Sequence, residues 1–215
     1  MIISPVRRFC FIHLPKTGGT SLTAAYEEIA RVDDLLFGDT PRAKIRQAGF
    51  NRGKPAAMRL SKHATLADAT HALPRLKLRD FMVVAIVRNP WDRLVSFYHW
   101  ARVQTFDHPQ VRAARRLGFP DFVRAPETAA AFSTPSNAYW MLETGPPSDL
   151  RLLRFEILAN EVATLPLATP LPLLPHLNMS DRPRDWRTLY DDETAALVPA
   201  LFPFETQELG YRFDP

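Results

Sequence analysis

Two short apolar runs, each followed by a segment of helical period, dominate the pattern of the chain. The aromatic and β-branched residues from 7 to 14 predict a buried strand, and residues 20–31 then predict an amphipathic helix. The most apolar run, residues 81–87, predicts a central strand of a parallel sheet, and a helix follows it to about residue 104. Both runs therefore predict the same strand–turn–helix unit.

Weaker patterns complete the expected elements. They are a short strand, a loop and a helix near 65–73 within residues 60–78, two short helical pieces within 106–135, a helix from Ser136 to about Gly145, a strand at 150–155, a helix at 156–165, and a last helix that Pro199 and Pro203 interrupt. Residues 33–59 predict a variable region, and residues 165–175 predict an irregular Leu/Pro-rich connector that wraps an apolar surface or contributes to a ligand site. Strands that alternate with helices predict an α/β fold, with a mostly parallel sheet covered by helices on both faces.

Length and composition narrow the class of protein. A chain of 215 residues suits one domain, 1–215, with a single core. Its single cysteine, Cys10, excludes an internal disulfide and fits a reducing compartment. No stretch approaches the ~20 apolar residues of a membrane span, and the N-terminus has no signal-peptide core. We therefore expect a cytoplasmic protein with no membrane anchor; its oligomeric state is not predicted.

Positive charge is concentrated in one part of the chain. Residues 42–79 contain ten Lys or Arg and one acid, Asp68. Such a segment is usually a solvated face, and beside an anion site it would also attract an anionic ligand. No helix-turn-helix, zinc-finger or RNA-binding pattern is present, so nucleic acid is not an expected partner.

The turn after the first strand has the composition of an anion-binding loop. It contains Lys16, the glycines Gly18 and Gly19, and hydroxyl residues, which are Thr17, Thr20 and Ser21. A strand–loop–helix turn of this kind directs backbone N–H groups and the positive end of a helix at one point. The loop is not a Walker A motif, in which the lysine follows the second glycine. It therefore predicts a phosphate or sulfate site of a different pattern.

A second candidate anion site follows the central strand. Arg88 comes directly after it, at the carboxyl end where open α/β sheets bind ligands. Asn89 is a predicted N-cap, Pro90 suits the first helical position, and Asp92 suits the acid of a capping box. Ser96 lies about two turns into the helix.

Together the strings P-K-T-G-G-T-S and R-N-P-W-D-R-L-V-S resemble the two donor-binding motifs of sulfotransferases that use PAPS (3′-phosphoadenosine 5′-phosphosulfate). The branch that they resemble contains bacterial enzymes and carbohydrate sulfotransferases related to heparan sulfate 2-O-sulfotransferase. The resemblance covers nearly the whole chain, although only these two motifs are specific. It implies a P-loop-NTPase-like fold and transfer of a sulfuryl group from PAPS to a hydroxyl, with release of PAP.

The resemblance also implies roles for individual residues. The residues implied to hold the 5′-phosphosulfate are Lys16, Thr17, Gly18, Gly19, Thr20 and Ser21, and Lys16 would also neutralise charge on the leaving phosphate. Arg88 and Ser96 would hold the 3′-phosphate. Ser180 and Arg182, in a late loop, are weaker candidates for additional contacts to that phosphate or to the nucleoside.

His63 is the predicted general base. It lies between the two motifs, where this branch has a catalytic histidine, and an imidazole titrates near neutrality. His13, within the first strand, is predicted to be structural, and His71 and His99 fall on predicted helices. No metal is expected, because the chain has no Cys/His ligand spacing and no H-E-x-x-H motif.

Two alternative functions and the acceptor remain open at this point. One alternative is a nucleotide kinase or NTPase with a degenerate P-loop, which would need magnesium, and the other is a PAP-binding module without catalysis. The acceptor is a hydroxyl-bearing glycan or small metabolite, and the basic segment favours a glycan with acid groups.

Overall fold

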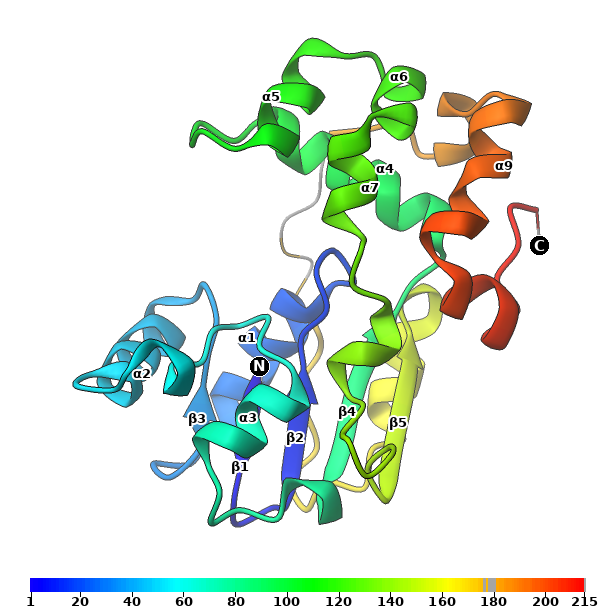
Figure 1. Ribbon diagram of the computed structural model, residues 1–215. Helices are drawn as coiled ribbons and strands as arrows, with labels where there is room; N and C mark the ends of the chain where they lie inside the picture. The colour runs from blue at the N-terminus through cyan, green and yellow to red at the C-terminus, as the bar shows by residue number, and fades with distance from the viewer. Residues whose placement is uncertain (176, 178–180, 215) are drawn as a thin grey trace. The chain divides into compact units, whose positions relative to one another are not determined.

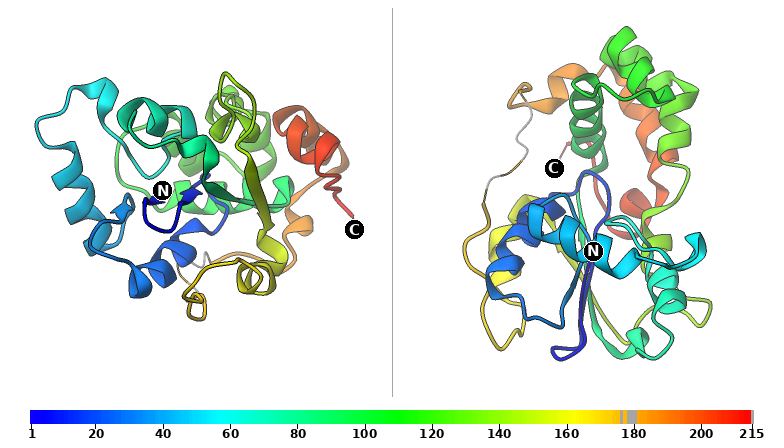
Figure 2. Two further views of the ribbon diagram at one scale, coloured as in Figure 1. Left: turned by 90° about the horizontal axis from the view of Figure 1, so that it is seen from below. Right: turned by 90° about the vertical axis from the view of Figure 1, so that its left-hand side faces the viewer.

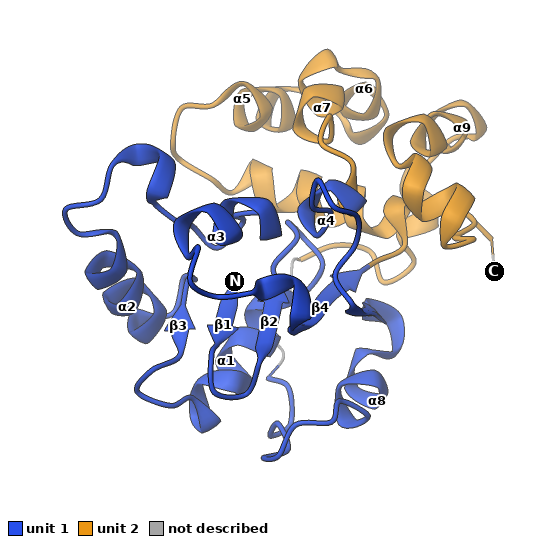
Figure 3. Cartoon of the chain, turned by 60° about the horizontal axis from the view of Figure 1, so that its bottom comes forward, with its two compact units in different colours: residues 1–87, 137–178 blue, residues 88–136, 179–215 orange. Residues whose placement is uncertain are grey.

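The computed structural model describes residues 1–175, 177 and 181–214. The chain divides into two compact units, each built from two segments (Figure 3). The first unit comprises residues 1–87 and 137–178, and the second comprises residues 88–136 and 179–215. A single domain over residues 1–215 stays a prediction.

The described part of the first unit is organised around a five-stranded sheet in the order β3-β1-β2-β4-β5 (Figure 1). Its strands are β1 (Ile2–Ser4), β2 (Phe9–Ile12), β3 (Leu35–Leu36), β4 (Met82–Val87) and β5 (Asp149–Arg154). β4 pairs in parallel with both β2 and β5, whereas β1 runs antiparallel to both β2 and β3. The sheet is thus mixed but mostly parallel, which confirms the predicted α/β class.

Helices lie on both sides of this sheet. They are α1 (Gly19–Ile29), α2 (Pro41–Asn51), α3 (Leu66–Ala72) and α8 (Leu158–Ala163). In the right-hand view of Figure 2, α1 in blue and α8 in yellow lie on one side of the strands, and α3 in turquoise lies on the other. Alternate strand residues, such as Phe9 and Phe11 of β2, form one buried cluster with Leu22 of α1 and Val162 of α8. Successive side chains of a strand point to opposite faces of the sheet, and β2 is buried on both faces.

The second unit is helical in its described residues. Its helices are α4 (Pro90–Arg102), α5 (Pro109–Arg116), α6 (Phe119–Arg124), α7 (Pro126–Ala131) and α9 (Asp192–Leu201), with a 3₁₀ turn at Trp186–Leu189 and a π turn at Phe204–Glu208. Aromatic rings fill its interior: Phe97 contacts Phe122 and Phe132, and Tyr98 contacts Phe119.

Several predicted elements were wrong in detail. Residues 106–135 form three helices, and each has a proline in its first turn, where the missing N–H costs nothing. Ser136 begins only a 3₁₀ turn that ends at Tyr139, and the chain then turns back at the Leu142–Gly145 bridge. Residues 60–78, all described, contain α3 but no strand. The elements β1, β3 and α2 were not predicted.

The Leu/Pro-rich connector wraps an apolar surface, as predicted. Leu165, Leu167, Leu171 and Leu174 pack against the buried cluster of the first unit.

Pro199 lies inside α9 without ending it. Pro199 cannot donate to the carbonyl of Ala195 four residues earlier, and the indole N–H of Trp91 donates to that carbonyl instead, at 2.9 Å.

Candidate functional site

The predicted anion loop connects β2 to α1 and contains two residues of positive φ. Lys16 has φ 64°, which costs a residue with a Cβ about 1–3 kcal/mol, and Gly18 has φ 86°. Gly18 is the N-cap of α1, and no side chain caps this end of the helix. The first N–H groups of α1 therefore remain unused by side-chain caps, as anion binding at a helix N-terminus requires.

Both glycines of the loop lie against aromatic rings. A Cβ added to Gly18 would be 2.6 Å from Cε2 of Phe155, and a Cβ added to Gly19 would be 2.4 Å from Cδ2 of His13. Real Cβ atoms do not approach other atoms so closely. The glycines thus permit a close packing of this turn that no larger residue allows without rearrangement.

The three hydroxyl residues of the loop differ in what they already bind. Thr17 is fully buried and donates to the carbonyl of Leu14 at 3.0 Å, so its hydroxyl already has a partner. The Ser21 hydroxyl accepts a long hydrogen bond, 3.4 Å, from the N–H of Leu177. Thr20 is partly exposed, and its side chain has no hydrogen-bond partner within the described ranges.

The carbonyl of His13 fixes the tautomer of His63. Nδ1 of His63 lies 2.7 Å from that oxygen, and because a carbonyl only accepts, Nδ1 carries the proton. Burial lowers the pKa of His63 to about 4; the His13 carbonyl opposes this shift and the charge of Lys62 adds to it. His63 is therefore neutral at pH 7, with the lone pair of Nε2 available to accept a proton.

His13 lies between the predicted base and the predicted anion loop. Its ring is buried, makes an edge contact with His63 at a centroid distance of 5.0 Å, and lies against Gly19. Burial, followed by the charges of the N-terminus, His63, Lys62 and Lys16, lowers the pKa of His13 well below its ordinary value. The structure thus gives His13 the packing role that the sequence predicts and brings three predicted residues, Gly19, His63 and Lys16, around it.

In the second unit, Arg88 forms an ion pair with Asp92 in which two guanidinium nitrogens contact one carboxylate oxygen. Nε donates to Oδ2 of Asp92 at 2.8 Å, and the second guanidinium nitrogen lies 2.7 Å from the same oxygen. Asn89 caps α4 as predicted, accepting from the N–H groups of Trp91 and Asp92 at 3.1 and 3.4 Å. The capping-box role predicted for Asp92 is wrong, because its carboxylate faces arginines instead.

Arg182 contacts the other oxygen of the same carboxylate. Arg88 and Arg182 therefore flank one acid, which leaves a net positive charge at the start of α4. Ser96 lies one turn beyond Asp92 on the same face and is largely buried, and its hydroxyl makes no hydrogen bond within the described part of the chain. The predicted contact from Ser180 lies outside the described residues.

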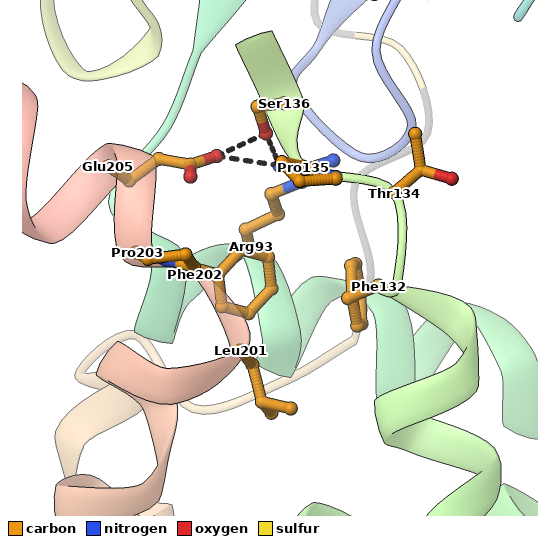
Figure 4. Close-up of a pocket in the computed structure, with 9 residues that line it drawn as sticks. All are labelled: Arg93, Phe132, Thr134, Pro135, Ser136, Leu201, Phe202, Pro203 and Glu205. Carbon is orange, nitrogen blue, oxygen red and sulfur yellow. Dashed lines mark hydrogen bonds and ion pairs between the residues drawn. The ribbon is translucent and has the colours of Figure 1, made fainter. Parts of the chain in front are cut away.

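A buried polar cluster in the second unit was not predicted (Figure 4). Arg93 contacts Glu205 at 3.0 Å and donates to Ser136 at 2.8 Å, and the Ser136 hydroxyl also donates to Glu205. The Arg93 guanidinium lies 5.5 and 5.4 Å from the ring centroids of Phe132 and Phe202. The sequence contains no signal for this cluster, since the three polar residues are distant along the chain.

The described residues contain neither a metal-binding cluster nor a membrane-spanning helix. No group of three or more His, Cys, Asp or Glu residues with metal-binding geometry occurs among them. None of their helices has the length and apolar character needed to cross a membrane.

Comparison with known proteins identifies the family. A family model described as "Sulfotransferase family" matches residues 1–144, and the chain belongs to this family. The match includes both strand–turn–helix motifs and His63. A search of curated proteins and a search of solved structures found no match.

Proposed function

We propose that the protein transfers a sulfuryl group from PAPS to the hydroxyl of an acceptor and releases PAP. The observation that carries the proposal is the pairing of β2 with β4. These strands are parallel neighbours, so the Lys16 loop and the segment that begins at Arg88 both follow carboxyl ends at one edge of one sheet. Family membership supports sulfuryl transfer in general. Family membership does not name the donor, so its identity as PAPS belongs to the proposal.

The two motifs bind the two anionic ends of the donor. The uncapped N–H groups of α1, Lys16 and Thr20 bind the 5′-phosphosulfate, and Lys16 neutralises charge that develops on the leaving phosphate. Arg88, Arg182 and Ser96 bind the 3′-phosphate, a group that ATP lacks. This second contact favours PAPS over ATP and argues against a nucleotide kinase.

His63 acts as the general base. Nε2 takes the proton of the acceptor hydroxyl as the acceptor oxygen bonds to sulfur and the bond from sulfur to the 5′-phosphate oxygen breaks. The Nδ1–H bond to the His13 carbonyl holds the ring in the tautomer that this step needs. We propose that the acceptor is a glycan with acid groups, because the basic segment includes the exposed residues Lys44 and Arg52.

A transfer assay with radiolabelled PAPS tests this function. Uronic-acid oligosaccharides and neutral hydroxylated metabolites serve as two acceptor panels. His63→Ala is expected to lower turnover by ~10²-fold or more while PAP binding stays nearly intact. The matched control is His71→Ala, which alters an exposed histidine of α3. Unchanged turnover in His63→Ala rejects this base, and magnesium-dependent ATP turnover without sulfate transfer rejects the reaction.

A further inference from the structure

One face of α4 is covered by the segment that contains Asp181 and Arg182. Asp92, Ser96 and His99 are spaced four and three residues apart, so they share this face. Arg182 contacts the carboxylate of Asp92, and the neighbouring residue Asp181 raises the pKa of His99 through its backbone and its charge. Two adjacent residues of one segment thus act on α4 residues on either side of Ser96.

One nitrogen of the His99 ring has no partner. Nε2 is buried and has no hydrogen-bond partner among the described residues. The backbone of Asp181 raises the pKa of His99, so it favours the protonated ring. Buried polar atoms without a partner are uncommon in folded proteins, and each one calls for a physical explanation.

The charges that face His99 come from both elements packed around it. Burial lowers the pKa of His99, the charges of Arg102 on α4 and of Arg182 lower it further, and Asp181 opposes this shift. The ring is therefore neutral at pH 7. An anion that neutralises Arg182 would reverse the electrostatic balance and favour the protonated ring.

We propose that His99 is a third basic contact, with Arg88 and Arg182, to the 3′-phosphate of the donor, and that it takes up a proton from solvent when the donor binds. The proposal rests on the proposed function, because it names a ligand of the same site. A protonated Nε2 donates a charge-assisted hydrogen bond to a phosphate oxygen, next to the Ser96 hydroxyl. This contact gives the unpartnered nitrogen its partner.

Calorimetry with PAP and AMP tests the role of His99 separately from the proposed function. AMP lacks the 3′-phosphate and serves as the matched ligand. His99→Gln is expected to weaken PAP binding about tenfold and to leave AMP binding unchanged. His71→Gln, in an exposed histidine, is the control variant. Equal PAP affinity in wild type and His99→Gln overturns the role of His99 alone, whereas a wild-type protein that does not bind PAP overturns the proposed function.

Proton uptake is the second measurement, and it is made first on the wild-type protein and then on two variants. Titrations in two buffers of different ionisation enthalpy give the number of protons taken up with PAP. Uptake is expected with the wild type and with His71→Gln, and less uptake is expected with His99→Arg, which keeps the charge. An NMR titration is expected to show that PAP raises the pKa of His99. An unchanged His99 titration overturns the proposal.

Discussion

Gly19→Ala is the substitution whose effect the structure defines most directly. The added Cβ would lie 2.4, 2.6 and 2.9 Å from Cδ2, Nε2 and Cγ of the His13 ring. That ring cannot move easily, because it is 5% exposed and is also in contact with His63. Overpacking of this kind costs about 1–3 kcal/mol. Alanine recovers up to about 1 kcal/mol of helix propensity at the start of α1, so we expect a net loss of about 1–2 kcal/mol.

Gly49→Ala provides the matched control for this prediction. Gly49 lies within α2, and a Cβ there would meet nothing within 4 Å. The same substitution should therefore stabilise the protein, by about 0.4–1 kcal/mol. Urea unfolding measures both changes, and calorimetry should show weaker PAP binding for Gly19→Ala alone. Equal unfolding midpoints for the two variants would refute the packing argument.

Two further predictions concern His63 and the buried pair of the second unit. Because the pKa of His63 is lowered to about 4, its active neutral form persists at low pH. The profile of kcat/KM should be flat between about pH 6 and pH 8 and should fall only as the pH drops towards about 4. Glu205→Ala leaves Arg93 buried without its acid and should lower the free energy of unfolding by about 3–5 kcal/mol. The double variant Arg93→Met/Glu205→Leu should recover most of this loss.

Each of these predictions has a result that contradicts it. An acid limb of kcat/KM near pH 6.5 would mean that His63 titrates as an exposed imidazole, or that another group is the base. Equal destabilisation by Glu205→Ala and by the double variant would mean that the unpaired charge of Arg93 is not the cause. Denaturant unfolding at fixed pH measures the second comparison.

Elements with a strong local pattern could be predicted from the sequence, and short ones could not. β2 and β4 are apolar runs followed by glycines or by Asn-Pro, and these residues predicted the turn of each motif. β1 and β3 have only three and two residues, too few for any periodicity. α2 did have a usable signal: Thr40 accepts from the N–H of Ala43, and Pro41 follows it. A Thr-Pro pair is typical of a helix start.

In the site, too, contacts between residues close in the sequence could be predicted, and contacts between distant residues could not. Arg88 and Asp92 are four residues apart, a spacing typical of ion pairs, although Asp92 was also a candidate for the acid of a capping box. The contacts of His13 with Gly19 and with His63, fifty residues away in the chain, depend on tertiary packing. The position of Arg182 beside Asp92 is of the same kind, because ninety residues separate them.

Calorimetric titration of PAP into the wild type and Arg88→Ala tests the central claim most directly. The claim is that the donor carries a 3′-phosphate and that Arg88 binds it. We expect a loss of about 2–5 kcal/mol in PAP binding, as occurs when one partner of a buried charged contact is removed. Arg75→Ala, which alters an exposed arginine, should bind PAP as the wild type does. Equal PAP affinity in all three proteins, or tighter binding of ATP than of PAP by the wild type, would contradict the account.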